Sequence, residues 1–202
     1  MVDTRPHDVL QYWIGASRND AAEAGRMNKL WFMKSDETDA EITHRFSATL
    51  DALTSGLADD WAALGPHGRL AAIIVLDQFS RNIYRGRPHA FAQDMQALAL
   101  TKRGLIAEDD LGLTEVERIF FYLPLEHSES AGEQEESIKY FTRLYETARP
   151  DFKPMTKSTL DYALAHKTII DRFGRYPHRN DILGRESTGE EIEFLKKPGS
   201  GF

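Results

Sequence analysis

Cysteine is absent from this chain of 202 residues. That absence excludes disulfide bridges, thiolate nucleophiles, iron–sulfur clusters and cysteine-ligated zinc. The sequence also lacks the glycine spacing of a nucleotide-binding loop, the nucleophile elbow of hydrolases and the paired-histidine helix of zinc enzymes. Any metal ion would need histidine and carboxylate ligands, such as His127 with His166 or His178. No metal-ligand spacing supports such a site, so we expect neither a metal ion nor another cofactor.

Long apolar runs are absent too. The longest, Leu70–Leu76, is far shorter than the roughly 20 residues that a membrane-spanning helix needs. The first residues, Met1–Asp8, contain no apolar segment of the kind found in export signals. The formal net charge of -7 argues against general binding to nucleic acid, which depends on a basic surface. These features predict a cytoplasmic protein that binds neither membranes nor nucleic acid.

Helical periodicity, by contrast, runs along almost the whole chain, without the alternation expected of strands. We predict an all-α fold of one domain, residues 1–202, with about eight to nine helices. Because the loops are short, consecutive helices should lie antiparallel and form an array of stacked pairs. The segment from Gly68 to Phe79 should be the central helix, because apolar side chains nearly surround it.

Local signals predict several boundaries in the first half of the chain. A polar stretch at residues 16–25 should separate the first two helices. The helix that begins at Pro88 should bury Phe91 and Met95 and should stop at Gly104.

The second half carries similar signals. A capping box at residues 114–117 should begin a helix that Pro124 interrupts. Another helix should end at Gly174. The last should begin with a capping box at Thr188 and should bury Ile192.

The most informative polar feature is the pentad Asp-x-Phe-x-Arg, which occurs at Asp77–Arg81 and again at Asp171–Arg175. Each copy follows an apolar helical run and leads into an Arg-Asn pair, Arg81-Asn82 in the first case and Arg179-Asn180 in the second. The aspartate and the arginine stand four residues apart, so we expect an ion pair on one helical face in each copy. Both segments are net positive within an acidic protein.

These arginines suit the binding of an anion, because the guanidinium group presents a planar fork of donors that matches a carboxylate or a phosphate. If the two segments face each other, their side chains could bind one small anion. The candidate ligand-binding residues in these segments are Asp77, Arg81, Asn82, Asp171, Arg175, Arg179, Asn180 and Arg185. The alternative is that acidic neighbours pair with these arginines in an internal salt-bridge network.

A histidine between two carboxylates, in Glu126–Glu129, forms the third polar feature. His127 could act as a general base that one of these glutamates orients, and His178 is a second candidate for acid/base chemistry. His166 lies on an apolar helical face, which is typical of a buried histidine with hydrogen-bonded ring nitrogens. We add Glu126 and His166 to the candidate ligand-binding residues.

Three hypotheses about function follow. The first is a pocket for a small phosphate- or carboxylate-bearing ligand, with acid/base chemistry at a histidine beside the arginines, and it leaves open whether the protein is an enzyme. The second is a helical-repeat scaffold that binds a peptide or protein partner in a long groove. In one variant, an arginine site captures the carboxylate that ends the tail Lys197–Phe202. The third is a purely structural network of salt bridges.

A family resemblance rests on three segments taken together: Asp77–Asn82, Pro124–Glu129 and Phe173–Asn180. With the opening Val9-Leu10-x-Tyr12-Trp13, they make the chain resemble the bacterial domain-of-unknown-function family 924 over nearly its whole length. The chain departs from the family's pattern at positions that hold no candidate site residue, namely Ile14, Ser80 and Ser130. The resemblance implies an all-helical fold similar to a tetratricopeptide-repeat superhelix, and it implies no particular activity.

Overall fold

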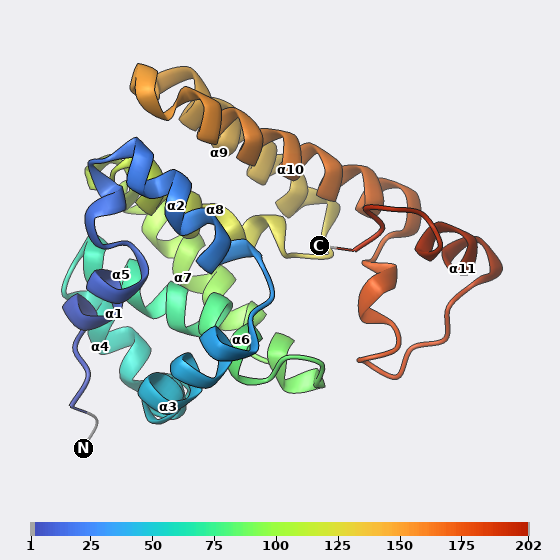
Figure 1. The fold of residues 1–202 in the computed structure, drawn as a ribbon, viewed down its shortest axis with the longest axis horizontal. Helices are drawn as coiled ribbons and strands as arrows, with labels where there is room; N and C mark the ends of the chain where they lie inside the picture. Colours follow the sequence, from blue (N-terminus) through green and yellow to red (C-terminus); the bar gives the residue numbers. More distant parts are fainter. Residues whose placement is uncertain (1–2, 202) are drawn as a thin grey trace.

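The computed structural model describes residues 3–201, and every regular element in that range is helical (Figure 1). A kinked turn joins α3 to α4, and a π-helical turn joins α5 to α6, so the eleven α-helical segments form nine continuous helices. The predicted all-α fold is confirmed. The segments are α1 (Pro6–Trp13), α2 (Ala21–Phe32), α3 (Asp36–Ala52), α4 (Ala58–Ala63), α5 (Pro66–Ile73), α6 (Ser80–Ile83), α7 (Asp94–Ile106), α8 (Glu115–Glu126), α9 (Ala131–Thr147), α10 (Lys153–Phe173) and α11 (Gly189–Leu195).

The centre of the fold is the helix that runs from α5 through the π-helical turn Ile74–Phe79 into α6. Every residue of this turn is buried, as the apolar sequence predicts. Phe79 packs against Trp13 of α1 and Phe46 of α3, with ring centroids 5.2 and 4.7 Å apart. A π-helical turn is rare and frequently marks a functional site. Here it places the carboxylate of Asp77 inside the protein.

The second half of the chain extends from this core as a hairpin of two long helices, α9 and α10, which run antiparallel side by side (Figure 1). α8 packs against both of them and also against α7. After α10 the chain turns back toward the end of α8, where the amide of Tyr176 donates a hydrogen bond of 2.8 Å to Glu129. Antiparallel neighbours were expected, whereas the tetratricopeptide-like superhelix and the single-domain boundary stay predictions. Of the helices in residues 3–201, none is long and apolar enough to cross a membrane.

Several predicted helix boundaries are confirmed. Each is determined by a side chain or a backbone conformation close to the boundary. Capping boxes begin α8 at Thr114 and α11 at Thr188. Gly174 ends α10 in a left-handed conformation with a φ of 67°. The polar stretch at residues 16–25, however, does not stay outside the helices. Asp20 caps α2 by accepting hydrogen bonds from the amides of Ala22 and Glu23, so the helix begins at Ala21.

Gly104 does not end its helix, contrary to the prediction, because α7 continues to Ile106. A Cβ atom at Gly104 would lie 2.5 Å from Cζ of Phe121 and 2.5 Å from Cδ of Arg69. The glycine therefore permits α7 to approach α8 and α5 closely. The glycine at this position is therefore needed for close packing between helices and does not mark the end of a helix.

Pro124 does not interrupt α8, which continues to Glu126. Proline cannot donate a hydrogen bond to the carbonyl one turn earlier. It nevertheless lies in the last turn of the helix, and the amide of His127 still donates to the carbonyl of Leu123 over 2.9 Å. The prediction of a break was therefore wrong, and the helix end carries both Glu126 and His127 toward the C-terminal segment.

Two side chains that were predicted to be buried face solvent. Met95 is 77% exposed, because Pro88 begins a single 3-10 turn, Pro88–Phe91, and α7 starts only at Asp94 with a different face inward. Ile192 is 47% exposed, because the short α11 turns the carboxylate of Glu191 inward instead.

Candidate functional site

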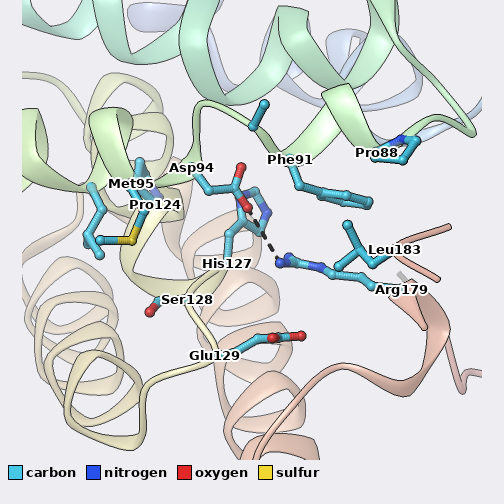
Figure 2. A pocket seen from close by; sticks show the side chains of 12 residues that line it. Pro88, Phe91, Asp94, Met95, Pro124, His127, Ser128, Glu129, Arg179 and Leu183 are labelled. Atoms are coloured by element: carbon cyan, nitrogen blue, oxygen red, sulfur yellow. Dashed lines mark hydrogen bonds and ion pairs between the residues drawn. The ribbon is translucent and has the colours of Figure 1, made fainter. Parts of the chain in front are cut away.

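A pocket of about 340 Å³ opens where the end of α8 meets the start of α7 and the segment that follows α10 (Figure 2). This volume is at the lower end of the range for small-molecule sites. The pocket is lined by Pro88, Phe91, Ala92, Asp94, Met95, Leu98, Pro124, His127, Ser128, Glu129, Arg179 and Leu183. Two of the predicted site residues, His127 and Arg179, therefore line the same concavity, although 52 positions separate them in the chain.

His127 and Asp77 form a buried dyad at the inner side of this pocket. Nδ1 of His127 lies 2.8 Å from Oδ1 of Asp77, and Asp77 also accepts a hydrogen bond from Gln78 and pairs with Arg81 over 3.1 Å. Burial alone would raise the pKa of Asp77, but its interactions with Arg81, His127 and Gln78 lower it well below the ordinary value. Asp77 is therefore a fixed negative charge that orients the imidazole.

The prediction that a neighbouring glutamate orients His127 was wrong, because the partner is Asp77, from the π-helical turn. Burial lowers the pKa of His127 below its ordinary value of 6.5, although the charge of Asp77 opposes that change. The imidazole is therefore neutral near pH 7. Because Nδ1 faces Asp77, Nε2 is the ring nitrogen that can exchange a proton with a ligand.

Asp94 connects the two arginines that the sequence placed in separate segments. Arg81 pairs with Asp94 over 2.9 Å, and Nη1 of Arg179 donates a longer hydrogen bond of 3.4 Å to the same carboxylate. The expected meeting of the two Arg-Asn segments thus takes place through Asp94 at the start of α7. Sequence reasoning missed Asp94, since an acidic residue in the first turn of a helix is an ordinary feature.

Arg179 is the least satisfied of the buried charged side chains around the pocket. Its side chain is 8% exposed, and its guanidinium lies over the rings of Phe91 and Tyr176, 4.7 and 4.5 Å from their centroids. Among residues 3–201, its side chain makes the one long hydrogen bond to Asp94, and its Nε has no partner. Burial and the nearby charge of Arg81 lower the pKa of Arg179. Arginine nevertheless stays protonated in proteins, so a buried charge with spare donors remains.

Behind the dyad lies a second buried acid–imidazole pair, Glu126 and His166. Oε1 of Glu126 is 3.1 Å from Nδ1 of His166, and that nitrogen also donates to the carbonyl of Tyr162 over 2.9 Å. Burial raises the pKa of Glu126 to about 8, with a smaller contribution from the charge of Asp77. Burial also lowers the pKa of His166 to about 3. The two groups are therefore both neutral near pH 7, and the expected buried and hydrogen-bonded His166 is confirmed.

His178 lies beside this region rather than in the pocket lining. Burial, followed by the charge of Arg179, lowers the pKa of His178 to about 4. Its ring is 5.5 Å from that of Tyr176, and Gly201 of the tail packs next to its Cβ. The tail carboxylate that was considered as a ligand belongs to Phe202, which lies outside the described residues.

A family model described as bacterial protein of unknown function DUF924 matches residues 9–199. The chain belongs to this family. A solved structure of a protein of unknown function, ATU0120 from Agrobacterium tumefaciens, is similar to it with 31% identity and a TM-score of 0.78, covering 95% of this chain and 96% of that one. No curated protein matches the chain.

In this DUF924 protein the second pentad does not form the expected ion pair. Asp171 pairs instead with Lys167 over 2.7 Å on the outer side of α10. Gly174 ends the helix between the two pentad residues, so Arg175 turns away and binds Glu191 with two hydrogen bonds of 2.7 and 2.8 Å. The first pentad does form the ion pair, because the helix continues past Arg81.

Three other candidate residues do not line the pocket themselves. Asn82 donates to Asp39 of α3 over 2.8 Å. Asn180 donates to Ser187 and, at 3.4 Å, to Glu191. Arg185 forms two hydrogen bonds of 2.7 and 3.0 Å with Glu129, which lines the pocket, so Arg185 acts on the site through that carboxylate.

The described residues, 3–201, contain no group of three or more histidine or carboxylate side chains placed to hold a metal ion. What the pocket offers instead is a hydrogen-bond donor with a positive charge, Arg179, next to a neutral imidazole, His127, that Asp77 orients. These groups can bind an anion and can accept a proton.

Proposed function

We propose that this protein binds a small anionic ligand in the cytoplasm, through Arg179 in the pocket, and that the His127–Asp77 dyad exchanges a proton with that ligand. The observation that carries the proposal is the buried guanidinium of Arg179, whose one hydrogen bond within residues 3–201 is long and whose Nε has no partner. A buried donor without an acceptor destabilises a protein by about 1–3 kcal/mol, and more when it is charged. A carboxylate or phosphate at the pocket would supply the missing acceptors.

The contrast with neighbouring arginines supports a ligand site over a purely structural network. Arg175 and Arg185 each form two hydrogen bonds with one glutamate and another with a backbone carbonyl, although Nε of Arg185 also has no partner. Arg179 shares the carboxylate of Asp94 with Arg81. The internal network therefore accounts for the first two residues and leaves Arg179 available.

The dyad adds the chemistry of a general base. Asp77 fixes Nδ1 of His127, and the neutral ring can accept a proton at Nε2. An anion at Arg179 would sit next to this imidazole and favour its protonated form. Proton transfer to or from the ligand is the reaction type that this arrangement supports.

The proposal is tested by isothermal titration of inorganic phosphate, succinate and hexanoate into the native protein and two matched variants. Arg179→Lys keeps the positive charge but loses the planar fork, and we expect affinity to fall by about ten- to a hundredfold, which corresponds to about 1.5–3 kcal/mol. Arg175→Lys makes the same change at an arginine outside the pocket and should leave affinity unchanged.

Asp94→Asn supplies a gain-of-affinity test. Because Asp94 competes with a ligand for Arg179, the amide should strengthen anion binding. If no anion in this series binds the native protein, or if Arg179→Lys binds as tightly as native, the proposed function is wrong.

A further inference from the structure

The walls of the pocket are far more apolar than an anion alone requires. Seven of the twelve lining residues carry hydrocarbon or thioether side chains: Pro88, Phe91, Ala92, Met95, Leu98, Pro124 and Leu183. In Figure 2, Arg179 points toward His127 and Asp94 in the middle of the view, and apolar side chains lie on both sides. A ligand held at Arg179 would therefore meet hydrocarbon over much of the lining beyond its charged group.

Two large side chains among these apolar residues face water. Met95 is 77% exposed and Leu183 is 36% exposed, and both line the pocket. Methionine is common at surfaces that accept varied apolar ligands, because its side chain is flexible and polarisable. An apolar ligand body would cover these side chains and remove their apolar surface from water, which favours binding.

The charges around the pocket fit an anion of a single charge. Within residues 3–201, the charged groups that line it, or pair with a group that does, are three arginines and three carboxylates: Arg81, Arg179, Arg185, Asp77, Asp94 and Glu129. These charges cancel, so the pocket has no surplus of positive charge for a phosphate dianion. Protonation of His127 would add one positive charge, which balances a monoanion but not a dianion.

The shape of the cation adds a preference for a flat acceptor. The Arg179 guanidinium lies over the rings of Phe91 and Tyr176, and its Nε, on the edge of the fork, has no partner. The edge of a guanidinium matches the two oxygens of a carboxylate in one plane. Asp94 already uses one nitrogen of that edge through a long contact of 3.4 Å, which a better placed carboxylate can replace.

We infer that the ligand is a monocarboxylate with an apolar body, whose carboxylate binds Arg179 and whose alkyl or aryl part lies against Phe91, Met95 and Leu183. This inference rests on the proposed anion site and adds the chemical class of its ligand. The modest volume of the pocket limits the body to a short chain or a single ring.

A chain-length series tests the inference on the full-length protein. Acetate, butanoate and hexanoate are titrated by calorimetry, and we expect affinity to rise by about fourfold for each added methylene. Hexanamide keeps the chain without the charge and should bind at least about tenfold more weakly than hexanoate. Hexyl phosphate carries the same chain on a dianion and should also bind more weakly than hexanoate.

Two surface variants on α7 locate the apolar body. Met95→Ser should weaken hexanoate binding by about threefold to tenfold and leave acetate binding unchanged. Ile106→Ser is the matched control, because Ile106 is 84% exposed on the same helix and does not line the pocket. Since both side chains are exposed, both variants should fold normally, which the melting temperature confirms.

The outcomes separate this inference from the proposed function. If inorganic phosphate or succinate binds in a manner that depends on Arg179, while affinity does not rise along the acetate series, the apolar monocarboxylate is wrong and the anion site stands. If hexanoate binds Arg179→Lys as tightly as it binds the native protein, the inference is overturned. If nothing binds in a manner that depends on Arg179, both fail.

Discussion

Replacing Glu126 with glutamine should change how the stability of the protein depends on pH. The pKa of Glu126 is raised from an ordinary value of 4.5 to about 8 in the folded protein, mainly by burial. Between those pH values the folded protein holds a proton on Glu126 that the unfolded chain has released. Stability is therefore lost as pH rises, by about 1.4 kcal/mol per pH unit for this group.

Glutamine cannot ionise, so Glu126→Gln removes this loss while keeping a side chain of similar shape next to His166. From about pH 5.5 to about pH 7.5, the variant should gain about 2 to 3 kcal/mol relative to the native protein. For a chain of this length that corresponds to roughly 5 to 10 °C in melting temperature.

The assay is thermal unfolding followed by circular dichroism at several pH values, with Glu135→Gln, an exposed position on α9, as the control. The pKa values of His166 and His178 are lowered to about 3 and about 4, so both residues reduce stability below about pH 6.5. This effect is the same in every variant and cancels in the difference in stability between the variant and the native protein. If the melting temperatures of the native protein and of Glu126→Gln changed with pH in the same way, the assignment of a neutral, buried Glu126 would be refuted.

Two further predictions concern packing and the C-terminal segment. Gly104→Ala should destabilise the protein by about 1–3 kcal/mol in chemical denaturation, because the added methyl group would meet Phe121 and Arg69. Gly25→Ala is the control, because Gly25 has open space around it in α2, and this variant should stabilise the protein by about 0.5–1 kcal/mol. Equal effects of the two substitutions would contradict the close contact at Gly104. Glu191→Gln should lower the free energy of unfolding by about 1–3 kcal/mol, because it weakens the paired hydrogen bonds to Arg175 and the capping box of α11. Glu190→Gln, at an exposed neighbour, should change it by less than about 0.5 kcal/mol, so a similar loss in both variants would mean that general charge, and not the buried contact, matters.

Helix boundaries were predictable where the deciding groups are close in sequence. The capping boxes at Thr114 and Thr188 and the left-handed Gly174 each act within one turn. Gly104 was misread because its role depends on Phe121, on another helix. The face that α7 buries likewise depends on where the preceding turn ends, and periodicity alone does not fix it.

In the candidate site, too, contacts between residues close in sequence were predictable and contacts between distant residues were not. The ion pair between Asp77 and Arg81 follows from four-residue spacing on one helix. The corresponding pair in the second pentad fails because Gly174 ends the helix first, a signal that the sequence itself contains. Asp94 could not have been found from sequence, since its contact with Arg179 joins residues 85 positions apart.

The pocket is assembled from three parts of the chain: the start of α7, the end of α8 and the turn after α10. Arg179, the positively charged residue of the pocket, is synthesised after all the helices of the central core. During synthesis the core could form on the ribosome before any binding site exists. A chain cleaved after α10 would likewise keep its central helices and lose the site. Ligand binding would thus report on completion of the whole chain, and a bound molecule would hold the C-terminal segment against the rest of the protein.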